Sequence, residues 1–244
     1  MYEKAKYLIS GDKALIVEFG ASIEETSNAK VRKLDELIGK ECILGIIETV
    51  PTYRSLMILY DPIVLELEEL INRLNVLEDK LNETSEVSGR IVEIPTLYGG
   101  EFGSDIGFVA EHNKISIDEV ISIHNSENYL VYMLGFTPGF PYLGGMSEKL
   151  ATPRLQTPRT KIIAGSVGIA GSQTGIYPID SPGGWQIIGR TPVKLYDPYR
   201  KEPVLLNAGD YIKFMPIDEV EYKEIEYMEN RGIYSISVTY LKGR

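Results

Sequence analysis

The second half of the chain consists of short strand-like runs separated by glycine and proline. Six of these runs lie at 129–134, 161–165, 167–171, 185–189, 193–196 and 211–215. Many short strands at close spacing, with turn residues between them, are typical of a closed or nearly closed β-barrel. The segment 135–189 also holds 11 of the 23 glycines. This concentration indicates either a turn-rich barrel or a place where backbone approaches a ligand closely.

The first 85 residues predict a smaller α+β domain. Strand-like runs at 7–9, 14–17, 43–49 and 55–60 alternate with two amphipathic patterns. Ser22 with Glu25 predicts a capping box for the first helix, and Asp61-Pro62 predicts the start of the second. This order suggests a sheet covered on one side, in the ferredoxin-like style. The polar stretch 82–89 predicts a linker, so the expected domains are 1–85 and 86–244.

The composition excludes several classes of partner. With 25 Lys and Arg against 35 Asp and Glu, the net charge is −10. Nucleic acid and anionic membrane surfaces both require a basic face, so neither is expected as the main partner. The single cysteine, Cys42, fits a reducing cytoplasm, and one Cys with two His argues against a zinc site. We expect a cytoplasmic protein with no evident metal site, although a carboxylate-only Mg²⁺ site stays open.

One segment of the chain contrasts with the negative net charge of the whole. Between residues 149 and 179 the chain has four cations and neither Asp nor Glu. The four are Lys149, Arg154, Arg159 and Lys161. Without a carboxylate nearby in sequence, the guanidinium groups of Arg154 and Arg159 are candidates to bind a small anion. The alternative is a pair of structural arginines that bond loop carbonyls.

His124 lies on the apolar face of a predicted helix. Ser116 with Glu119 forms a capping box, and Ile117, Val120, Ile121 and His124 follow at helical spacing. A lone histidine in such a stripe is more often a core residue than a catalyst. If His124 borders a pocket, its ordinary pKa near 6.5 suits proton transfer.

Several long motifs in the glycine-rich half resemble one known family, that of the B subunit of 5-oxoprolinase, also called the kinase A inhibitor or allophanate hydrolase subunit 1 family. The motifs are GFTPGFPYL at 135–143, Pro-Arg at 153–154 and 158–159, AGSVGIAG at 164–171, QTGIYP at 173–178, SPGGW at 181–185 and GRTP at 189–192. The resemblance implies a small α+β domain followed by a cyclophilin-like closed β-barrel that carries the active site.

The resemblance also implies how such a protein works. The B subunit works in a complex with 5-oxoprolinase subunits C and A, which together open 5-oxo-L-proline to L-glutamate using ATP. Subunits B and C are thought to activate the lactam by phosphorylation. Other relatives handle urea-derived substrates in a carboxyltransferase region, and one inhibits autophosphorylation of a histidine kinase. Three roles therefore stay open: subunit of a metabolic enzyme, subunit of an allophanate hydrolase or urea carboxyltransferase, and kinase inhibitor.

With this resemblance, site roles can be assigned to the matching residues. His124 is the expected catalytic group, and a small anionic substrate is expected to bind the other residues. These are Arg154, Arg159, Ser166, Gln173, Thr174 and Trp185. The arginines would anchor the anion, and the three polar residues would donate hydrogen bonds to a lactam or acyl oxygen. Trp185 would form a wall of the pocket or, alternatively, belong to the barrel core. The chain contains no P-loop or G-x-G-x-x-G motif, so whether ATP contacts it stays open.

Overall fold

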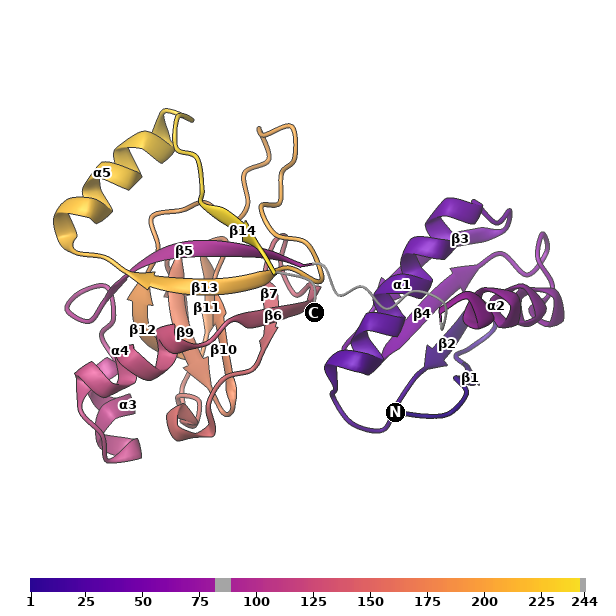
Figure 1. Cartoon of the computed structure of the whole chain (residues 1–244), viewed down its shortest axis with the longest axis horizontal. Coiled ribbons are helices and arrows are strands. Elements are labelled where there is room, and N and C mark those ends of the chain that lie inside the picture. The colour runs from indigo at the N-terminus through magenta and orange to yellow at the C-terminus, as the bar shows by residue number, and fades with distance from the viewer. Residues whose placement is uncertain (82–88, 242–244) are drawn as a thin grey trace. The chain divides into compact units, whose positions relative to one another are not determined.

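The structure is a computed structural model that describes residues 1–81 and 89–241. The described residues form two compact units, 1–81 and 89–241 (Figure 1). The predicted linker at 82–89 lies outside the described residues except for Gly89. Each unit has a hydrophobic core of its own.

The first unit is a four-stranded antiparallel sheet with two helices. Its elements are β1 (Lys6–Ile9), β2 (Ala14–Glu18), α1 (Glu25–Glu41), β3 (Ile46–Pro51), β4 (Ser55–Tyr60) and α2 (Leu67–Leu81). The strand order is β1-β2-β4-β3. This is the order of a ferredoxin-like sheet in which the last strand of the chain has been moved to the beginning. Inward-facing Leu15 and Ile58 pair across β2 and β4, and both helices bury their apolar faces in the same core.

Both predicted helix starts in this unit are wrong in detail. The residue before α1 is Glu24, which makes no side-chain cap, and the Ser22 hydroxyl instead donates to Glu24 at 2.6 Å. Asp61 accepts a hydrogen bond from the backbone N–H of Ile63 at 3.0 Å and so forms a turn ahead of the second helix. Helix α2 therefore begins only at Leu67. Short polar side chains compete for local backbone groups, which explains why such residues can form turns as well as caps.

The second unit is a nearly closed barrel, which confirms the predicted fold (Figure 1). Its main strands are β5 (Arg90–Tyr98), β6 (Tyr129–Leu134), β7 (Pro141–Gly144), β9 (Ser166–Ala170), β10 (Gln173–Ile176), β12 (Gln186–Arg190) and β13 (Tyr211–Pro216). They follow the order β10-β9-β12-β5-β13-β6-β7, and the two end strands lie against each other. Strand β14 (Val238–Tyr240) pairs with β5, while β8 (Arg159–Ile162) and β11 (Ser181–Gly183) form a separate two-stranded sheet. The predicted run at 193–196 forms no strand there, only an isolated bridge at Tyr196.

The helices of the second unit are α3 (Ile106–Asn113), α4 (Ile117–Ser126), a short 3-10 turn η1 (Glu148–Leu150) and α5 (Glu219–Asn230). The capping box predicted for α4 is confirmed. The Ser116 hydroxyl accepts from the N–H of Glu119 at 3.1 Å, and the Glu119 carboxylate accepts from the N–H of Ser116 at 2.7 Å. This cap fixes the register of α4 and thereby directs His124 into the barrel. In the described ranges, every helix is too short or too polar to cross a bilayer.

Candidate functional site

His124 lies in the core of the barrel and not at its surface. Its side chain is fully buried, and its ring centroid lies 4.3 Å from that of Phe214. Nδ1 lies 2.8 Å from the Tyr98 hydroxyl and Nε2 lies 2.8 Å from the Thr174 hydroxyl. Both ring nitrogens therefore have protein partners. The geometry favours the structural interpretation of His124 and does not support the predicted contact with substrate.

The hydrogen bonds around His124 define a neutral imidazole. The Thr174 hydroxyl donates its single proton to the carbonyl of Gly168 at 3.1 Å. Nε2 must then carry the proton that bonds Thr174, and Nδ1 accepts from the Tyr98 hydroxyl. Burial lowers the pKa of His124 from 6.5 to about 3, because a charged ring would be desolvated. A neutral imidazole with a hydrogen bond at each nitrogen holds Tyr98 and Thr174 of the barrel wall in place. Such a group is poorly suited to proton transfer near pH 7.

This burial predicts a pH dependence of stability. In the unfolded chain a histidine binds its proton near pH 6.5, whereas in the folded protein the pKa of His124 is about 3. Between these values the unfolded state binds more protons, so His124 should lower stability as the pH falls, by up to about 1.4 kcal/mol per pH unit. Urea unfolding of wild type and His124→Leu at pH 8, 7, 6 and 5 measures this effect. The stability difference between the two should be constant above pH 7 and shrink below pH 6; a constant difference down to pH 5 would contradict it.

Two of the three predicted hydrogen-bond donors belong to the barrel wall. Ser166 and Thr174 are buried, at the start of β9 and within β10. The Thr174 hydroxyl is occupied by His124 and Gly168, which leaves no proton for a substrate oxygen. Gln173 is half-buried at the start of β10. The structure therefore does not gather these three residues into one open site.

The cationic segment 149–179 contains no acidic residue, but folding places carboxylates from outside the segment next to some of its cations. Arg159 Nη2 lies 2.7 and 2.9 Å from the two carboxylate oxygens of Asp105, which is 54 residues away. Asp105 also accepts a hydrogen bond from the N–H of Ile187 at 2.6 Å. Lys161 pairs with Asp180 at 2.7 Å. The expectation that no carboxylate competes for the guanidinium groups is therefore wrong for Arg159, because folding brings Asp105 from elsewhere in the chain.

Arg154 is the arginine of the stretch that folding leaves unpaired. Its side chain is exposed, and it forms no hydrogen bond or ion pair with any residue in the described ranges. Burial raises the pKa of Tyr177 to about 12, and the positive charges of Arg154 and Arg159 oppose that rise. Both guanidinium groups therefore lie within electrostatic reach of the Tyr177 hydroxyl. A free guanidinium beside a paired one is suited to bind a single carboxylate or phosphate.

Trp185 packs as a core residue of a small cluster, which we call the aromatic cluster. Its buried members are Phe140, Ile162, Ala170, Tyr177, Trp185 and Ile187. The ring centroid of Trp185 lies 5.8 Å from that of Phe140 and 6.0 Å from that of Tyr177, both in edge-on contact. A Cβ at Gly175 would lie only 3.0 Å from the indole, so this glycine makes room for the ring. The Trp185 carbonyl accepts from Arg159 at 3.1 Å and ties the cluster to the arginines.

A surface hollow of about 340 Å³ lies next to the aromatic cluster. It is lined by Leu134, Gly135, Phe136, Thr137, Pro138 and Gly139, which are the end of β6 and the loop before β7. The Phe136 ring meets Phe140 edge-on with centroids 5.6 Å apart. A Cβ at Gly139 would lie 3.6 Å from Pro178, the neighbour of Tyr177. The loop, the aromatic cluster and Arg154 together form the candidate site, which offers apolar walls and one free cation.

Sequence reasoning missed several residues of this site. Tyr177 and Thr137 lie inside the motifs at 173–178 and 135–143. These motifs marked the two segments in the sequence but gave no role to either side chain. Asp105 gave no local signal, because its role depends on an arginine far along the chain. In the described part of the chain, no three His, Cys, Asp or Glu side chains gather in a way that could hold a metal ion.

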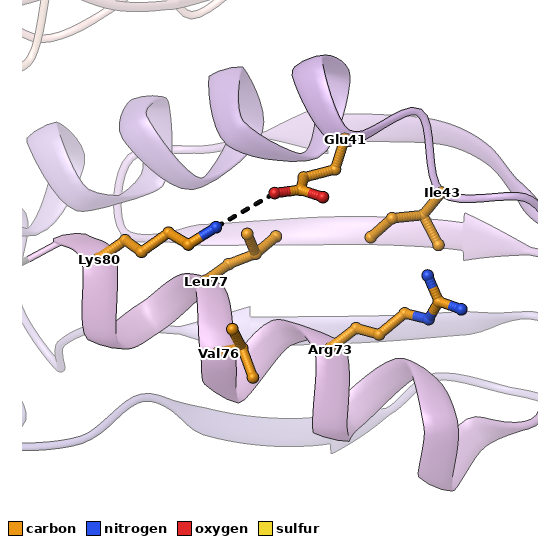
Figure 2. A pocket seen from close by; sticks show the side chains of 6 residues that line it. All are labelled: Glu41, Ile43, Arg73, Val76, Leu77 and Lys80. Carbon is orange, nitrogen blue, oxygen red and sulfur yellow. Dashed lines mark hydrogen bonds and ion pairs between the residues drawn. The ribbon is translucent and has the colours of Figure 1, made fainter.

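The first unit has a separate groove at the end of α1. Its lining residues are Glu41, Ile43, Arg73, Val76, Leu77 and Lys80 (Figure 2). Lys80 reaches across from α2 to Glu41, with 3.1 Å between Nζ and Oε1, as the dashed line in Figure 2 shows. Arg73 pairs with Glu69 one turn earlier on α2. Because each charged side chain of the groove already has a partner, we place the candidate site on the barrel.

Comparison with known proteins gives the class to which this fold and site belong. Residues 5–206 match the family described as carboxyltransferase domain, subdomain C and D. The chain is therefore a member of this carboxyltransferase-domain family.

Three individual proteins show what this chain is similar to within the family. A protein of Bacillus subtilis (strain 168), named as the B subunit of 5-oxoprolinase, is 47% identical over 222 residues, which cover 87% of this chain and 92% of that protein. Its namesake in Escherichia coli O157:H7 is 39% identical, covering 89% of this chain and 98% of that protein. The urea amidolyase of Lachancea kluyveri is 27% identical, and the match covers 96% of this chain but 14% of that protein.

A solved structure supports the fold. The crystal structure of TTHA0988 is 37% identical and superposes with a TM-score of 0.76. The match covers 84% of this chain and 40% of the other, so this chain spans about two fifths of that protein.

Proposed function

We propose that the protein is the B subunit of an ATP-dependent 5-oxoprolinase, which helps to convert 5-oxo-L-proline to L-glutamate with subunits A and C. Relatives of that name match nearly nine tenths of this chain at 39–47% identity. Nearly the whole length of those relatives is covered as well, 92% and 98%. We infer that the chain is inactive alone, since its site supplies binding groups but no evident nucleophile.

The observation that carries this proposal is the unpaired Arg154 beside the aromatic cluster. 5-Oxoproline is a small five-membered ring with one carboxylate and one lactam amide. A guanidinium recognises a carboxylate through charge-assisted hydrogen bonds, and apolar aromatic walls suit the methylene groups of the ring. Arg159 is paired with Asp105, which leaves Arg154 as the group that would bind the carboxylate. The site therefore matches the negative charge and the apolar ring of this substrate.

In the reaction, the lactam oxygen takes the γ-phosphoryl group of ATP, and ADP leaves. Water then adds to the activated carbon, the ring C–N bond breaks, phosphate leaves and the carboxylate of glutamate forms. The residues of this chain would hold the substrate while these steps occur, with Arg154 as the anchor of its carboxylate. ATP remains the cofactor of the complex, and we assign none of its contacts to this chain. His124 would stabilise the barrel wall behind the site.

Leaving the chain out of a reconstituted mixture tests the proposal directly. Purified subunits A, B and C with ATP and 5-oxoproline should release glutamate, and omission of this chain should reduce the release at least about 100-fold. Enzymatic determination of glutamate measures the rate, and heat-unfolded chain added back serves as the control. Unchanged turnover without this chain would refute the proposed function.

The likeness to urea amidolyases supports a second candidate, a subunit of an allophanate hydrolase or urea carboxyltransferase. The lower identity, 27% against 47%, favours the first candidate. Supplying the chain with a biotin carboxylase, a biotin carrier and urea distinguishes the two. Carboxylated urea formed only when the chain is present would favour the second.

A further inference from the structure

The loop between β6 and β7 carries polar groups that it does not use. The Thr137 hydroxyl oxygen is buried and has no hydrogen-bond partner among the described residues. In the same part of the chain, the N–H groups of Phe136 and Gly139 donate to no backbone carbonyl. A buried hydroxyl without a partner costs about 1–3 kcal/mol, and native structures retain few of them. Three donors left over in one five-residue loop indicate a ligand with an acceptor oxygen.

The backbone of this loop is also strained. Phe136 has a φ of +65°, a region that side-chain-bearing residues rarely adopt, and the N–H of Thr137 donates to the carbonyl of Gly135 at 2.8 Å. The Phe136 side chain is 69% exposed, so packing offsets little of the cost. Residues held in such conformations are found preferentially at ligand-binding and switch positions.

The loop forms one side of the candidate site, next to the aromatic cluster. Phe140 follows the loop directly in the chain and is a buried member of the aromatic cluster with Tyr177 and Trp185. Ser166 and Thr174, which the sequence suggested as donors to a lactam oxygen, are in contrast buried in the barrel wall. The donor role therefore needs other residues, and the loop supplies them on the open side of the cluster.

We propose that the loop 135–139 recognises the amide of the substrate, and that Thr137 is a specificity-determining residue whose hydroxyl donates a hydrogen bond to the lactam carbonyl oxygen. The free N–H groups of Phe136 and Gly139 are further donors to the same oxygen. Because the Thr137 hydroxyl oxygen is buried, binding requires the loop to shift, and relief of the strain at Phe136 lowers the cost of that shift. This inference rests on the proposed function and adds to it the group that distinguishes a lactam from a simple amino acid.

Two substitutions at Thr137 separate the hydroxyl from the shape of the side chain. Thr137→Val should lower kcat/KM for 5-oxoproline at least about 100-fold in the reconstituted complex, the lower end of the range seen when one donor to a developing oxyanion is lost. Thr137→Ser keeps the hydroxyl and should stay within about threefold of wild type. Thr239→Val, at an exposed position on β14, is the matched control and should be unchanged. The stability of Thr137→Val should not fall, because a buried hydroxyl without a partner is removed.

Probe binding keeps this inference distinct from the proposed function. 2-Pyrrolidinone has the lactam without the carboxylate, and L-proline has the carboxylate without the lactam. Titrated into the full chain and followed by NMR, 2-pyrrolidinone should bind Thr137→Val at least about fivefold more weakly than wild type, while L-proline binding should be unchanged. Equal binding of 2-pyrrolidinone by both proteins, or none by wild type, would overturn the inference. If the wild-type complex does not turn over 5-oxoproline, the proposed function is refuted. The inference about the loop is then decided by the binding of 2-pyrrolidinone alone.

Discussion

Replacing Arg154 with glutamine should lower kcat/KM for 5-oxoproline by about 100-fold. Arg154 is the cation of the candidate site that has no carboxylate partner in the described chain, so its full charge is available to a bound anion. A hydrogen bond to a charged group contributes about 1.5–3 kcal/mol, which corresponds to roughly 10- to 150-fold in rate or binding. Steady-state glutamate release by the reconstituted complex measures the effect, and co-elution with the C subunit shows whether the variant still assembles.

An arginine elsewhere in the barrel unit provides the matched control for this result. Arg231 is exposed after α5, with its guanidinium over the ring of Tyr227. Arg231→Gln removes the same charge from the protein and should change kcat/KM by less than about twofold. If Arg154→Gln stays within about threefold of wild type, the anchoring role of Arg154 is wrong. Comparable losses in both variants would show that the net charge, and not the site, is responsible.

The second large effect should be a loss of stability. His124→Leu should lower the free energy of unfolding of the barrel by about 3–5 kcal/mol, because it removes two buried hydrogen bonds and leaves the Tyr98 hydroxyl without its acceptor, while Thr174 keeps only its bond to Gly168. Trp185 is the single tryptophan of the chain and lies in this unit, so its fluorescence during urea unfolding reports the barrel directly.

The other histidine of the chain is the control for this experiment. His112 is exposed near the end of α3 and stacks on Phe108, so His112→Leu should change stability by less than about 0.5 kcal/mol. The same variants also test the two interpretations of His124. A His124→Leu protein with unchanged stability and lost turnover would restore the catalytic role that the sequence suggested.

Local sequence patterns determined much of the fold. Turn residues between short apolar runs predicted the barrel, and the runs at 129–134 and 211–215 coincide with β6 and β13 to within a residue. The Ser116–Glu119 pair predicted a helix start that the structure contains. These features depend on residues a few positions apart, which is why they can be recognised in a sequence. Where two local signals compete, as at Asp61, the pattern predicted the wrong start.

The candidate site depended on contacts that local patterns do not contain. Arg154 and Arg159 look alike in sequence, each after a proline in an acid-free stretch. Folding places Asp105 against Arg159 and leaves Arg154 free, because the loop before α3 approaches β8 only in the closed barrel. The apolar stripe placed His124 on an inner face, but only its complete burial in the closed barrel decided that it stays neutral there. The sequence by itself thus determined the family, the barrel and the glycine-rich segment in which we place the candidate site. Which cation stays free to bind was decided by tertiary structure, since charges pair with whatever folding brings within hydrogen-bonding distance, about 3 Å.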